Sequence, residues 1–370
     1  MNFAFTDDQL ELRQGVRAVL EGECGIDALR AFYAAAPEDR GVASRARWAV
    51  LAELGAPTLL VPEAGGGLGL DLTDVIGVLE EAGWADLPEP LLETAVIAAP
   101  TLATLLPNSS ATAALDALVH QQAMVAVGGF DITAQGPVSA TTSVAADGLL
   151  TTPRVVGARD AALLSLACRD LESGWQLHVV PAASCRIEGI PALDASRDLS
   201  TVHWPLSSDT LLAYGVAAEA LVQLMSDRAA AGSAALLLGL TDRVVTMAAD
   251  YAKDRHQFGK PIGSFQAVKH LLANARVALE FARPATYRAA WSIATAQPTL
   301  SHDASMAKAM ASDAADLAAR VALQVHGAIG YTWECDLHFF LKRIWALSRA
   351  WGDAATHRRL VLDAALAQRR

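Results

Sequence analysis

Cysteine and metal-binding patterns are nearly missing from this chain. Its 370 residues include four cysteines, Cys24, Cys168, Cys185 and Cys335, which form no CxxC pair and no zinc-ribbon spacing. The nine histidines include no HExxH motif and no pair four residues apart that would place two imidazoles on one helix face. We therefore interpret the cysteines as reduced core thiols and expect no metal site built from protein side chains.

Long apolar runs are missing as well. The longest nearly apolar stretches, 94–106 and 229–240, are shorter than the roughly 18 to 20 residues that a membrane-spanning helix needs. Asp7 and Asp8 stand where a secretory signal would carry lysine or arginine. The sequence thus predicts no membrane span and a cytoplasmic location.

Positive charge is in short supply. The chain has 29 lysines and arginines against 40 aspartates and glutamates, which gives a net charge of −11. Residues 209–370 hold 18 basic and 14 acidic side chains (+4), so residues 1–208 hold 11 and 26 (−15). Nucleic acid is therefore not an expected partner, although the C-terminal part is suited to a phosphate-bearing ligand. A hydrophobic content of 53% with 19% charged residues is typical of a globular protein.

Helical patterns fill the first 120 residues. Thr6 and Gln9 form a capping box ahead of apolar residues at helical spacing. Further helices are predicted over about 41–54, from 71 or 73 to 83, and over 89–106, with a turn at 107–110.

The pattern changes near residue 121 and changes back near residue 209. Short runs rich in Val, Leu and Thr, bounded by turn residues, predict a small antiparallel β domain with strands at 123–128, 138–145, 149–156, 161–168 and 175–181. Long helical segments with short connections then predict an antiparallel bundle with helices at about 211–254, 264–296, 301–326, 335–349 and 353–368. The predicted fold is mainly α with a β domain (α+β): a helical domain over 1–120, a β domain over 121–208 and a helical bundle over 209–370.

Two glycine-containing junctions in the C-terminal part carry candidate binding residues. Residues 254–270 read DRHQFGKPIGSFQAVKH, in which Arg255 closes a helix and Gly259 permits a sharp reversal. Taken alone, this segment is a capped helix hairpin or an arginine fork presented to a pyrophosphate. Residues 324–343 read QVHGAIGYTWECDLHFFLKR and place small residues between two helices, where a ligand reaches exposed backbone amides.

Together these two segments resemble the acyl-CoA dehydrogenase family, in which both hold FAD. Residues 61–83, VPEAGGGLGLDLTDVIGVLEEAG, are similar to the early helical region of that family. The resemblance implies a central β-barrel between an N-terminal helical domain and a C-terminal four-helix bundle, assembled as a dimer or a dimer of dimers. It also implies an acyl-CoA substrate, FAD, an electron-transfer acceptor protein, and a cofactor site formed by Arg255, Phe258, Gln266, Gln324, Val325, His326, Gly327 and Ala328.

The sequence departs from the family where the catalytic base is expected. Desaturation of a thioester needs a carboxylate to remove the α-proton while flavin accepts a hydride. Counting from the family motifs, one usual base position falls on Trp351 and the other at about Ala229. Asp353 and Asp227 are the nearest carboxylates and are weak candidates for a displaced base. For Asp353 the structural alternative is N-capping of the last helix.

The β domain departs from the family too, in the segments that line the flavin ring. GGFDITAQGPVSA (128–140) and TTPRVVGARDA (151–161) stand where relatives carry Thr-Glu-Pro and Trp-Ile/Val-Thr/Ser motifs. The chain therefore resembles the base-lacking subunit of an actinobacterial heterotetramer built from two homologous dehydrogenase chains. The alternatives are an active homomer that uses Asp353 or Asp227, and a scaffold or regulatory subunit without flavin.

Overall fold

The computed structural model describes residues 4–141, 148–170 and 174–367. The chain divides into two compact units. Unit 1 comprises residues 1–31, 76–87 and 230–370, and unit 2 comprises residues 32–75 and 88–229. The division of the sequence into domains over 1–120, 121–208 and 209–370 stays a prediction.

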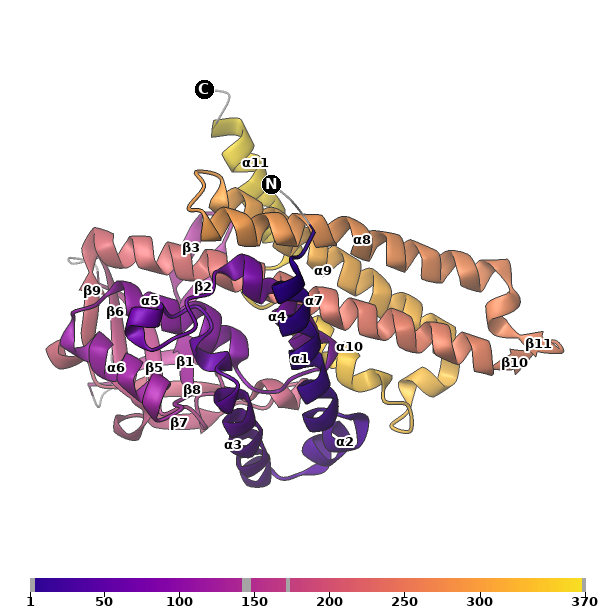
Figure 1. Cartoon of the computed structure of the whole chain (residues 1–370), viewed down its shortest axis with the longest axis horizontal. Coiled ribbons are helices and arrows are strands. Elements are labelled where there is room, and N and C mark those ends of the chain that lie inside the picture. The colour runs from indigo at the N-terminus through magenta and orange to yellow at the C-terminus, as the bar shows by residue number, and fades with distance from the viewer. Residues whose placement is uncertain (1–3, 142–147, 171–173, 368–370) are drawn as a thin grey trace. The chain divides into compact units, whose positions relative to one another are not determined.

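Unit 1 is helical apart from one short hairpin. Figure 1 shows α8 and α9 side by side, with the β10–β11 hairpin at one end of α7. Its helices, of which α2, α4 and α7 are shared with unit 2, are α1 (Asp7–Glu23), α2 (Ile26–Ala34), α4 (Leu72–Trp84), α7 (Gly215–Asp254), α8 (Gln266–Ala294), α9 (Leu300–His326), α10 (Leu337–Leu347) and α11 (Ala354–Ala367). The expected long C-terminal helices are therefore present, each within a few residues of the predicted bounds.

Local sequence explains why these helices begin and pack as they do. The predicted capping box is confirmed, because Thr6 Oγ1 accepts from the Gln9 amide at 3.2 Å and Gln9 Oε1 accepts from the Thr6 amide at 2.9 Å. Small side chains on one face of α9 let neighbouring helices approach closely. These fully buried alanines are Ala304, Ala307, Ala311, Ala315, Ala318 and Ala322.

Two glycines let α4 and α7 cross in backbone contact. A Cβ at Gly239 would overlap the carbonyl oxygen of Glu80, and one at Gly83 would overlap the carbonyl oxygen of Leu236. Any larger residue at either position would therefore push the two helices apart. This crossing places Glu80 and Glu81 at the centre of unit 1.

Unit 2 surrounds its strands with shorter helices. Its helical segments, besides the parts shared with unit 1, are α3 (Pro37–Glu53), the 3-10 turns η1 (Ala56–Thr58) and η2 (Glu63–Gly65), the π-helix η3 (Leu92–Ala98), α5 (Ala99–Thr104) and α6 (Ser109–His120). The single helix predicted over 89–106 is therefore a π-helix that continues as an α-helix. Thr94 fixes the π-helix to β1, since its hydroxyl donates to the Val125 carbonyl at 3.0 Å and accepts from the Val125 amide at 3.1 Å.

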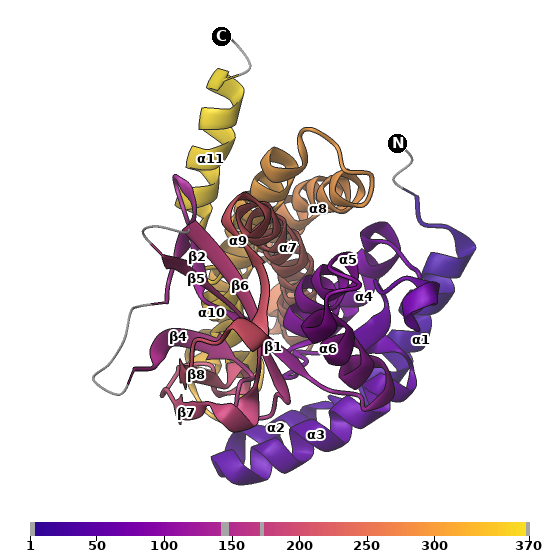
Figure 2. The ribbon, with the colours of Figure 1, turned by 90° about the vertical axis from the view of Figure 1, so that its left-hand side faces the viewer.

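The described strands of unit 2 form three separate sheets. One is four-stranded in the order β1-β5-β6-β9, one three-stranded in the order β4-β8-β7, and the last pairs β2 with β3. Their bounds are β1 (Val125–Gly128), β2 (Phe130–Thr133), β3 (Gly136–Ser139), β4 (Leu150–Val156), β5 (Leu163–Asp170), β6 (Gly174–Pro181), β7 (Arg186–Gly189), β8 (Leu199–Trp204) and β9 (Leu211–Tyr214). Figure 2 shows these strands with α3 running beside β7 and β8.

The mainly helical fold with a central strand region is confirmed, and two details of that region need correction. The described strands form open sheets rather than a closed barrel, because the edge strands β1 and β9 of the larger sheet hydrogen-bond to no strand of the three-stranded sheet. The larger sheet is also not wholly antiparallel, since β1 runs parallel to β5 after the chain has passed through β2, β3 and β4. Of the strand predicted over 138–145, residues 142–145 lie outside the described residues.

Helix α7 has a composition that bears on the predicted absence of a membrane span. Within the described residues it is the one helix long and apolar enough to cross a bilayer, and 78% of its most apolar window is buried inside the protein. Core helices of globular proteins meet the same length and composition criteria.

Candidate functional site

The end of α7 turns sharply into a two-stranded hairpin. β10 (His256–Gln257) pairs with β11 (Lys260–Pro261), and the two residues between them, Phe258 and Gly259, have φ of +54° and +77°. Two successive positive φ values are typical of the type I′ reversal that suits hairpins. The reversal leaves Phe258 91% exposed, with its ring edge-on to Phe265 at 6.1 Å between centroids.

Arg255 stands at the base of this hairpin with a fixed backbone and an exposed side chain. Its amide donates to the Tyr251 carbonyl at 2.9 Å, and its carbonyl accepts from the Ile262 amide at 2.8 Å. Across the described residues, no carboxylate contacts its guanidinium group. Gln266, the first residue of α8, is exposed as well. The hairpin thus presents a cation, an aromatic ring and an amide to solvent.

The second predicted segment forms the end of α9 and the turn that follows. Gln324 is exposed, Val325 and His326 are buried, and α9 ends at His326. Gly327 has φ +65° and ψ −139°, a conformation open essentially to glycine alone. A Cβ added there would meet nothing within 4 Å, so the backbone at Gly327 and the exposed Ala328 is open to a ligand.

A ring stack joins these two segments in space. Tyr251 lies over His326 with centroids 4.5 Å apart and ring planes 20° from parallel. His326 donates through Nδ1 to the Ala322 carbonyl at 2.8 Å, and burial lowers its pKa, so the stacked imidazole is neutral at pH 7. The two motifs, about 70 residues apart in sequence, therefore lie at the same end of unit 1. Their role in holding a cofactor stays a prediction.

Asp353 caps the last helix. Its Oδ1 accepts from the Thr356 amide at 2.8 Å, ahead of α11. This backbone hydrogen bond lowers the pKa of the Asp353 carboxyl. A carboxylate with a lowered pKa is a weaker base, so the capping interaction argues against a displaced base at this position.

The turn before Asp353 is held by a buried lysine that sequence patterns did not single out. Lys308 is fully buried on α9, and its Nζ donates to the carbonyls of Leu347 at 3.0 Å, Ser348 at 3.2 Å and Gly352 at 3.0 Å. A fourth contact, at 3.1 Å, is to Ser312 Oγ. The ammonium group therefore fixes the backbone on both sides of Trp351, the residue at one expected base position. His357 Nε2 adds a 2.8 Å hydrogen bond to the Trp351 carbonyl.

In unit 2, the second expected base position is also occupied by an apolar residue. Ala229 is fully buried, and Asp227 is 4% exposed two residues before it on α7. Gln223, one helical turn earlier, donates through Nε2 to both Asp227 oxygens at 3.2 Å.

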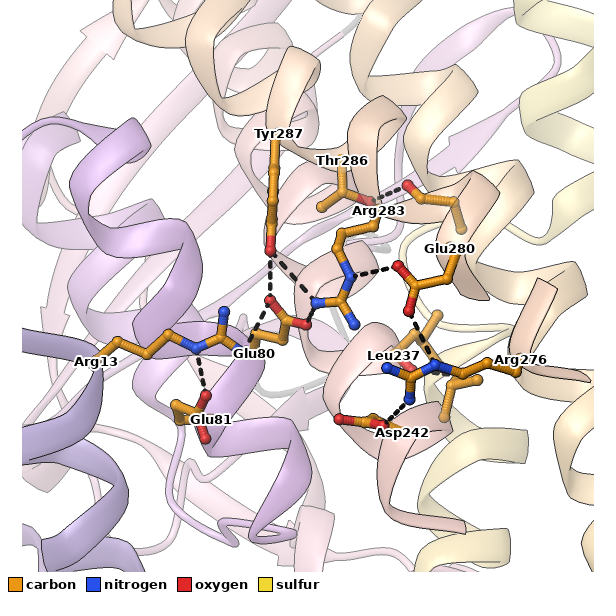
Figure 3. Close-up of polar contacts among 12 residues, drawn as sticks. Arg13, Glu80, Glu81, Leu237, Asp242, Arg276, Glu280, Arg283, Thr286 and Tyr287 are labelled. Carbon is orange, nitrogen blue, oxygen red and sulfur yellow. Dashed lines mark hydrogen bonds and ion pairs between the residues drawn. The ribbon is translucent and has the colours of Figure 1, made fainter. Parts of the chain in front are cut away.

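The other buried carboxylates of the described residues are held by cations or hydroxyl groups. In unit 1, Arg283 and Tyr287 contact Glu80 (Figure 3), and Arg13 and Arg17 contact Glu81. Asp303 is held by Arg288, Ser292 and Thr299, and Asp86 by Arg343. In unit 2, Arg47 pairs with Glu89, Arg197 with Glu93, and Tyr33 donates to Asp194. Pairing of this kind favours the ionised form of a carboxylate, although burial raises the pKa of Glu89 despite its contact with Arg47.

The β-domain segments that departed from the expected motifs are packed into the core of unit 2 only in part, because residues 128–130, 152 and 155–158 are buried and residues 131–140 are half-buried or exposed. Val155 is fully buried and Val156 is 6% exposed. A Cβ added to Gly128 would lie 2.8 Å from Val155 Cγ2, so the side chain of Val155 fills the space beside β1. The Thr152 hydroxyl accepts from Trp204 Nε1 at 3.0 Å. These residues therefore stabilise the sheets and offer no free hydroxyl at positions 155 or 156.

Comparison with known proteins identifies the family. The family model for the acyl-CoA dehydrogenase N-terminal domain matches residues 6–105, and that for the C-terminal domain matches residues 217–366. The chain belongs to the acyl-CoA dehydrogenase family. It is 32% identical to acyl-CoA dehydrogenase IpdE2 of Mycobacterium tuberculosis over 91% of both chains. It is 33% identical to acyl-CoA dehydrogenase FadE34 of the same organism over 91% of this chain and 45% of that one.

Solved structures share the fold over nearly the whole chain. The ChsE4-ChsE5 complex from Mycobacterium tuberculosis gives a TM-score of 0.85 at 22% identity and covers 100% of this chain and 99% of that one. A variant of the Tcur3481-Tcur3483 steroid ACAD gives 0.82 at 25% identity, over 98% and 99%. The structure titled PigA with FAD and proline gives 0.84 at 19% identity, over 100% of both chains. The family is one of FAD-dependent oxidoreductases that act on CH–CH bonds, so the predicted enzyme class is confirmed.

Proposed function

We propose that this chain is one subunit of an FAD-dependent acyl-CoA dehydrogenase that oxidises an acyl-CoA thioester to the α,β-enoyl-CoA, with the base supplied by a homologous partner subunit. The observation that carries the proposal is that Trp351 and Ala229 occupy both base positions. Neither side chain accepts a proton, and Asp353, the carboxylate nearest to Trp351, caps a helix. A carboxylate from another chain would complete the reaction.

The FAD site of this proposal uses Arg255, Phe258, Gln266 and the segment from Gln324 to Ala328. The residues fit one end of the cofactor, because Arg255 offers an exposed guanidinium to a pyrophosphate and Gly327 leaves its backbone open. When bound, FAD accepts the hydride that leaves the substrate β-carbon. The neutral His326 ring stacked on Tyr251 holds the two segments together and adds no charge beside the pyrophosphate.

Exposed aromatic side chains near this site support contact with a second chain. Phe258 is 91% exposed, Tyr331 78% and Trp333 77%. Phenylalanine, tyrosine and tryptophan are enriched at protein–protein interfaces relative to the rest of a protein surface. The ChsE4-ChsE5 complex and the Tcur3481-Tcur3483 protein, which this chain resembles in fold, are named for two components each. We propose a heterotetramer of two homologous chains.

We propose a lipid or steroid side chain as the acyl group, supported by the likeness to a protein described as a steroid ACAD. The reduced flavin would pass its electrons to an electron-transfer protein. We propose a cytoplasmic location, which the lack of a disulfide among the four cysteines, all within the described residues, supports.

The absorption spectrum of the purified chain tests this proposal against its two rivals. A flavin spectrum only after co-expression with a homologous chain supports the heteromer. A flavin spectrum and acyl-CoA-dependent bleaching of the chain alone support an active homomer, for which buried Asp227 is the leading base. A colourless protein in both preparations supports a scaffold without redox chemistry and contradicts the proposal.

A further inference from the structure

A cavity of about 340 Å³ lies within unit 2 and involves none of the segments proposed to hold FAD. Its walls are the first half of α3, the turn between β4 and β5, and the η5 loop (Ala195–Arg197) with Asp198, while Pro88 and Pro90 close one side. Figure 2 shows α3 beside the strands of this region. The volume falls in the range of small-molecule sites, which is about 300 to 1,000 Å³.

Close contacts and left-handed backbone conformations fix the walls of the cavity. Gly157 has φ +67°, and a Cβ added to it would lie 2.9 Å from Pro90 Cγ. Its amide donates to the Asp198 carbonyl at 3.1 Å, and Asp198 itself has φ +42°. A non-glycine residue in the left-handed region is strained, and such residues gather at binding and catalytic sites. On the opposite wall, a Cβ at Gly41 would stand 2.8 Å from Asp160 Oδ1.

Two ion pairs brace these walls. Arg45 on α3 contacts Asp160 on the β4–β5 turn, and Arg159 on the same turn contacts Asp198 beside the η5 loop. The carboxylates are the more enclosed partners, with side chains 14% and 19% exposed. The pairs therefore fix the shape of the cavity and leave the carboxylates of Asp160 and Asp198 at its wall, together with that of the exposed Glu38.

Arg40 supplies a positive charge that these pairs do not balance. Its Nε donates to the Phe32 carbonyl at 3.1 Å and its Nη2 to the Tyr33 carbonyl at 3.2 Å. Carbonyl groups fix the guanidinium without neutralising it, and in the described part of the chain no carboxylate is paired with it. The half-buried guanidinium thus stands ready to hold an anion in a fixed orientation.

We propose that this cavity binds a small carboxylate that has an apolar body and a hydrogen-bond donor. The carboxylate pairs with Arg40. The donor, a hydroxyl or ammonium group, faces the carboxylate of Asp160 or Asp198. The apolar body packs on Phe32 and the prolines Pro88 and Pro90. A carboxylate is a better match than a phosphate because the neighbouring aspartates disfavour a doubly charged group.

Calorimetric titration of the full-length chain, in its complex if one forms, tests the proposal with four related probes. 3-Phenyllactate and L-phenylalanine carry the carboxylate, the donor and a phenyl ring. 3-Phenylpropanoate lacks the donor, and 2-phenylethanol lacks the carboxylate. We expect 3-phenyllactate or L-phenylalanine to bind at least about tenfold more tightly than 2-phenylethanol, since one charge-assisted contact is worth that much or more.

Variants separate this cavity from binding elsewhere. Arg40→Met should lower the affinity for the carboxylate probes about tenfold or more and leave the affinity for 2-phenylethanol unchanged. Arg186→Met, on β7 outside the cavity, should change neither affinity. Ala195→Phe should fill the cavity and abolish binding of every probe, with circular dichroism confirming that it folds. Equal binding of all probes, binding unaffected by Arg40→Met and Ala195→Phe, or no saturable binding up to about 10 mM would overturn the proposal.

Discussion

The hydroxyl of Tyr287 on α8 donates to Glu80 Oε2 on α4 at 2.8 Å, and Glu80 is only 2% exposed. Arg283 contacts the other oxygen of Glu80, and Arg13 approaches Oε2 at 3.4 Å from α1 (Figure 3). One buried carboxylate thus ties three helices of unit 1 together, at the place where α4 and α7 cross.

Replacing this carboxylate should destabilise unit 1. Glu80→Gln keeps the size of the side chain but removes the buried negative charge that Arg283 and Arg13 share, and leaves Glu280 and Glu81 as their remaining carboxylate partners. Removing one partner of a buried ion pair typically costs about 3 to 5 kcal/mol. Urea unfolding monitored by circular dichroism measures the change. The matched control is Glu280→Gln, whose carboxylate pairs with Arg283 and Arg276 at 48% exposure and should cost less than about 1 kcal/mol.

Much of the helical fold follows from sequence pattern, and the exceptions have physical causes. The cap at Thr6 was predicted from the capping box that Thr6 forms with Gln9. The long helices of the C-terminal part were predicted because their apolar spacing is regular over many turns. Helix α6 was missed because its face is built largely from alanine, which barely marks an apolar pattern. Its cap was taken as a turn residue, although Asn108 Oδ1 accepts from the Ser110 and Ala111 amides at 2.9 and 3.0 Å.

The candidate site likewise has a part that could be predicted from the sequence and a part that could not. The turns after Arg255 and Gln324 could be predicted because glycine-containing junctions leave a sequence signal, and the role of these segments in holding a cofactor stays a prediction. The Lys308 contacts could not be predicted, because three of its hydrogen-bond partners are backbone carbonyls some forty residues away, and every residue type carries a backbone carbonyl. The cavity beside Arg40 is formed by segments from four parts of the chain, so only tertiary structure brings its walls together.

Loss of the Arg255 guanidinium should weaken flavin retention. Arg255→Ala removes the charged group expected to contact the pyrophosphate, and losing one charge-assisted contact should lower flavin affinity roughly 10- to 150-fold. Flavin content after dilution and gel filtration of the assembled protein is the measurement. Lys253→Ala, an exposed cation two residues away, is the control and should retain flavin. Unchanged flavin occupancy in Arg255→Ala would remove Arg255 from the site.

Lys308 should be indispensable to the turn around Trp351. Lys308→Met preserves much of the side-chain volume but leaves the carbonyls of Leu347, Ser348 and Gly352 without their donor. Burying unpaired carbonyls should cost about 3 kcal/mol or more in the free energy of unfolding. Lys253→Met, at 73% exposure, should change stability by less than about 0.5 kcal/mol in the same urea titration. Equal stability of the two variants would show that the hydrogen bonds of Lys308 do not stabilise the fold.

The protein should lose stability on mild acidification. Burial lowers the pKa of His357 to about 4, against 6.5 when unfolded, because its neutral ring lies 1% exposed. The unfolded chain therefore binds more protons between these two values, so the stability that neutral His357 confers is complete above pH 6.5 and is lost as pH falls toward 4. The difference between the two pKa values corresponds to at most about 3 kcal/mol.

A variant isolates the contribution of His357 from that of His178, whose pKa burial also lowers to about 4. His357→Asn should flatten the dependence of unfolding free energy on pH between 6.5 and 4, and His178→Asn should flatten it independently. Urea midpoints measured across this range provide the test. A wild-type curve that is already flat there would mean that both imidazoles are charged in the folded protein.

The final prediction concerns where the α-proton is removed. With Trp351 and Ala229 at the base positions, a partner chain that carries a glutamate at one of them should be required for turnover. Glu→Gln in that partner should reduce the rate by at least about 10² to 10⁴-fold, the usual contribution of a positioned base. Asp353→Asn and Asp227→Asn in this chain should leave the rate of the assembly within a few-fold, because one carboxylate caps α11 and the other is bound by Gln223. Stopped-flow bleaching of the flavin by an acyl-CoA separates this step from electron transfer to the acceptor. If Asp227→Asn abolishes bleaching while the partner's Glu→Gln does not, the base lies in this chain, and the buried start of α7 is the active centre.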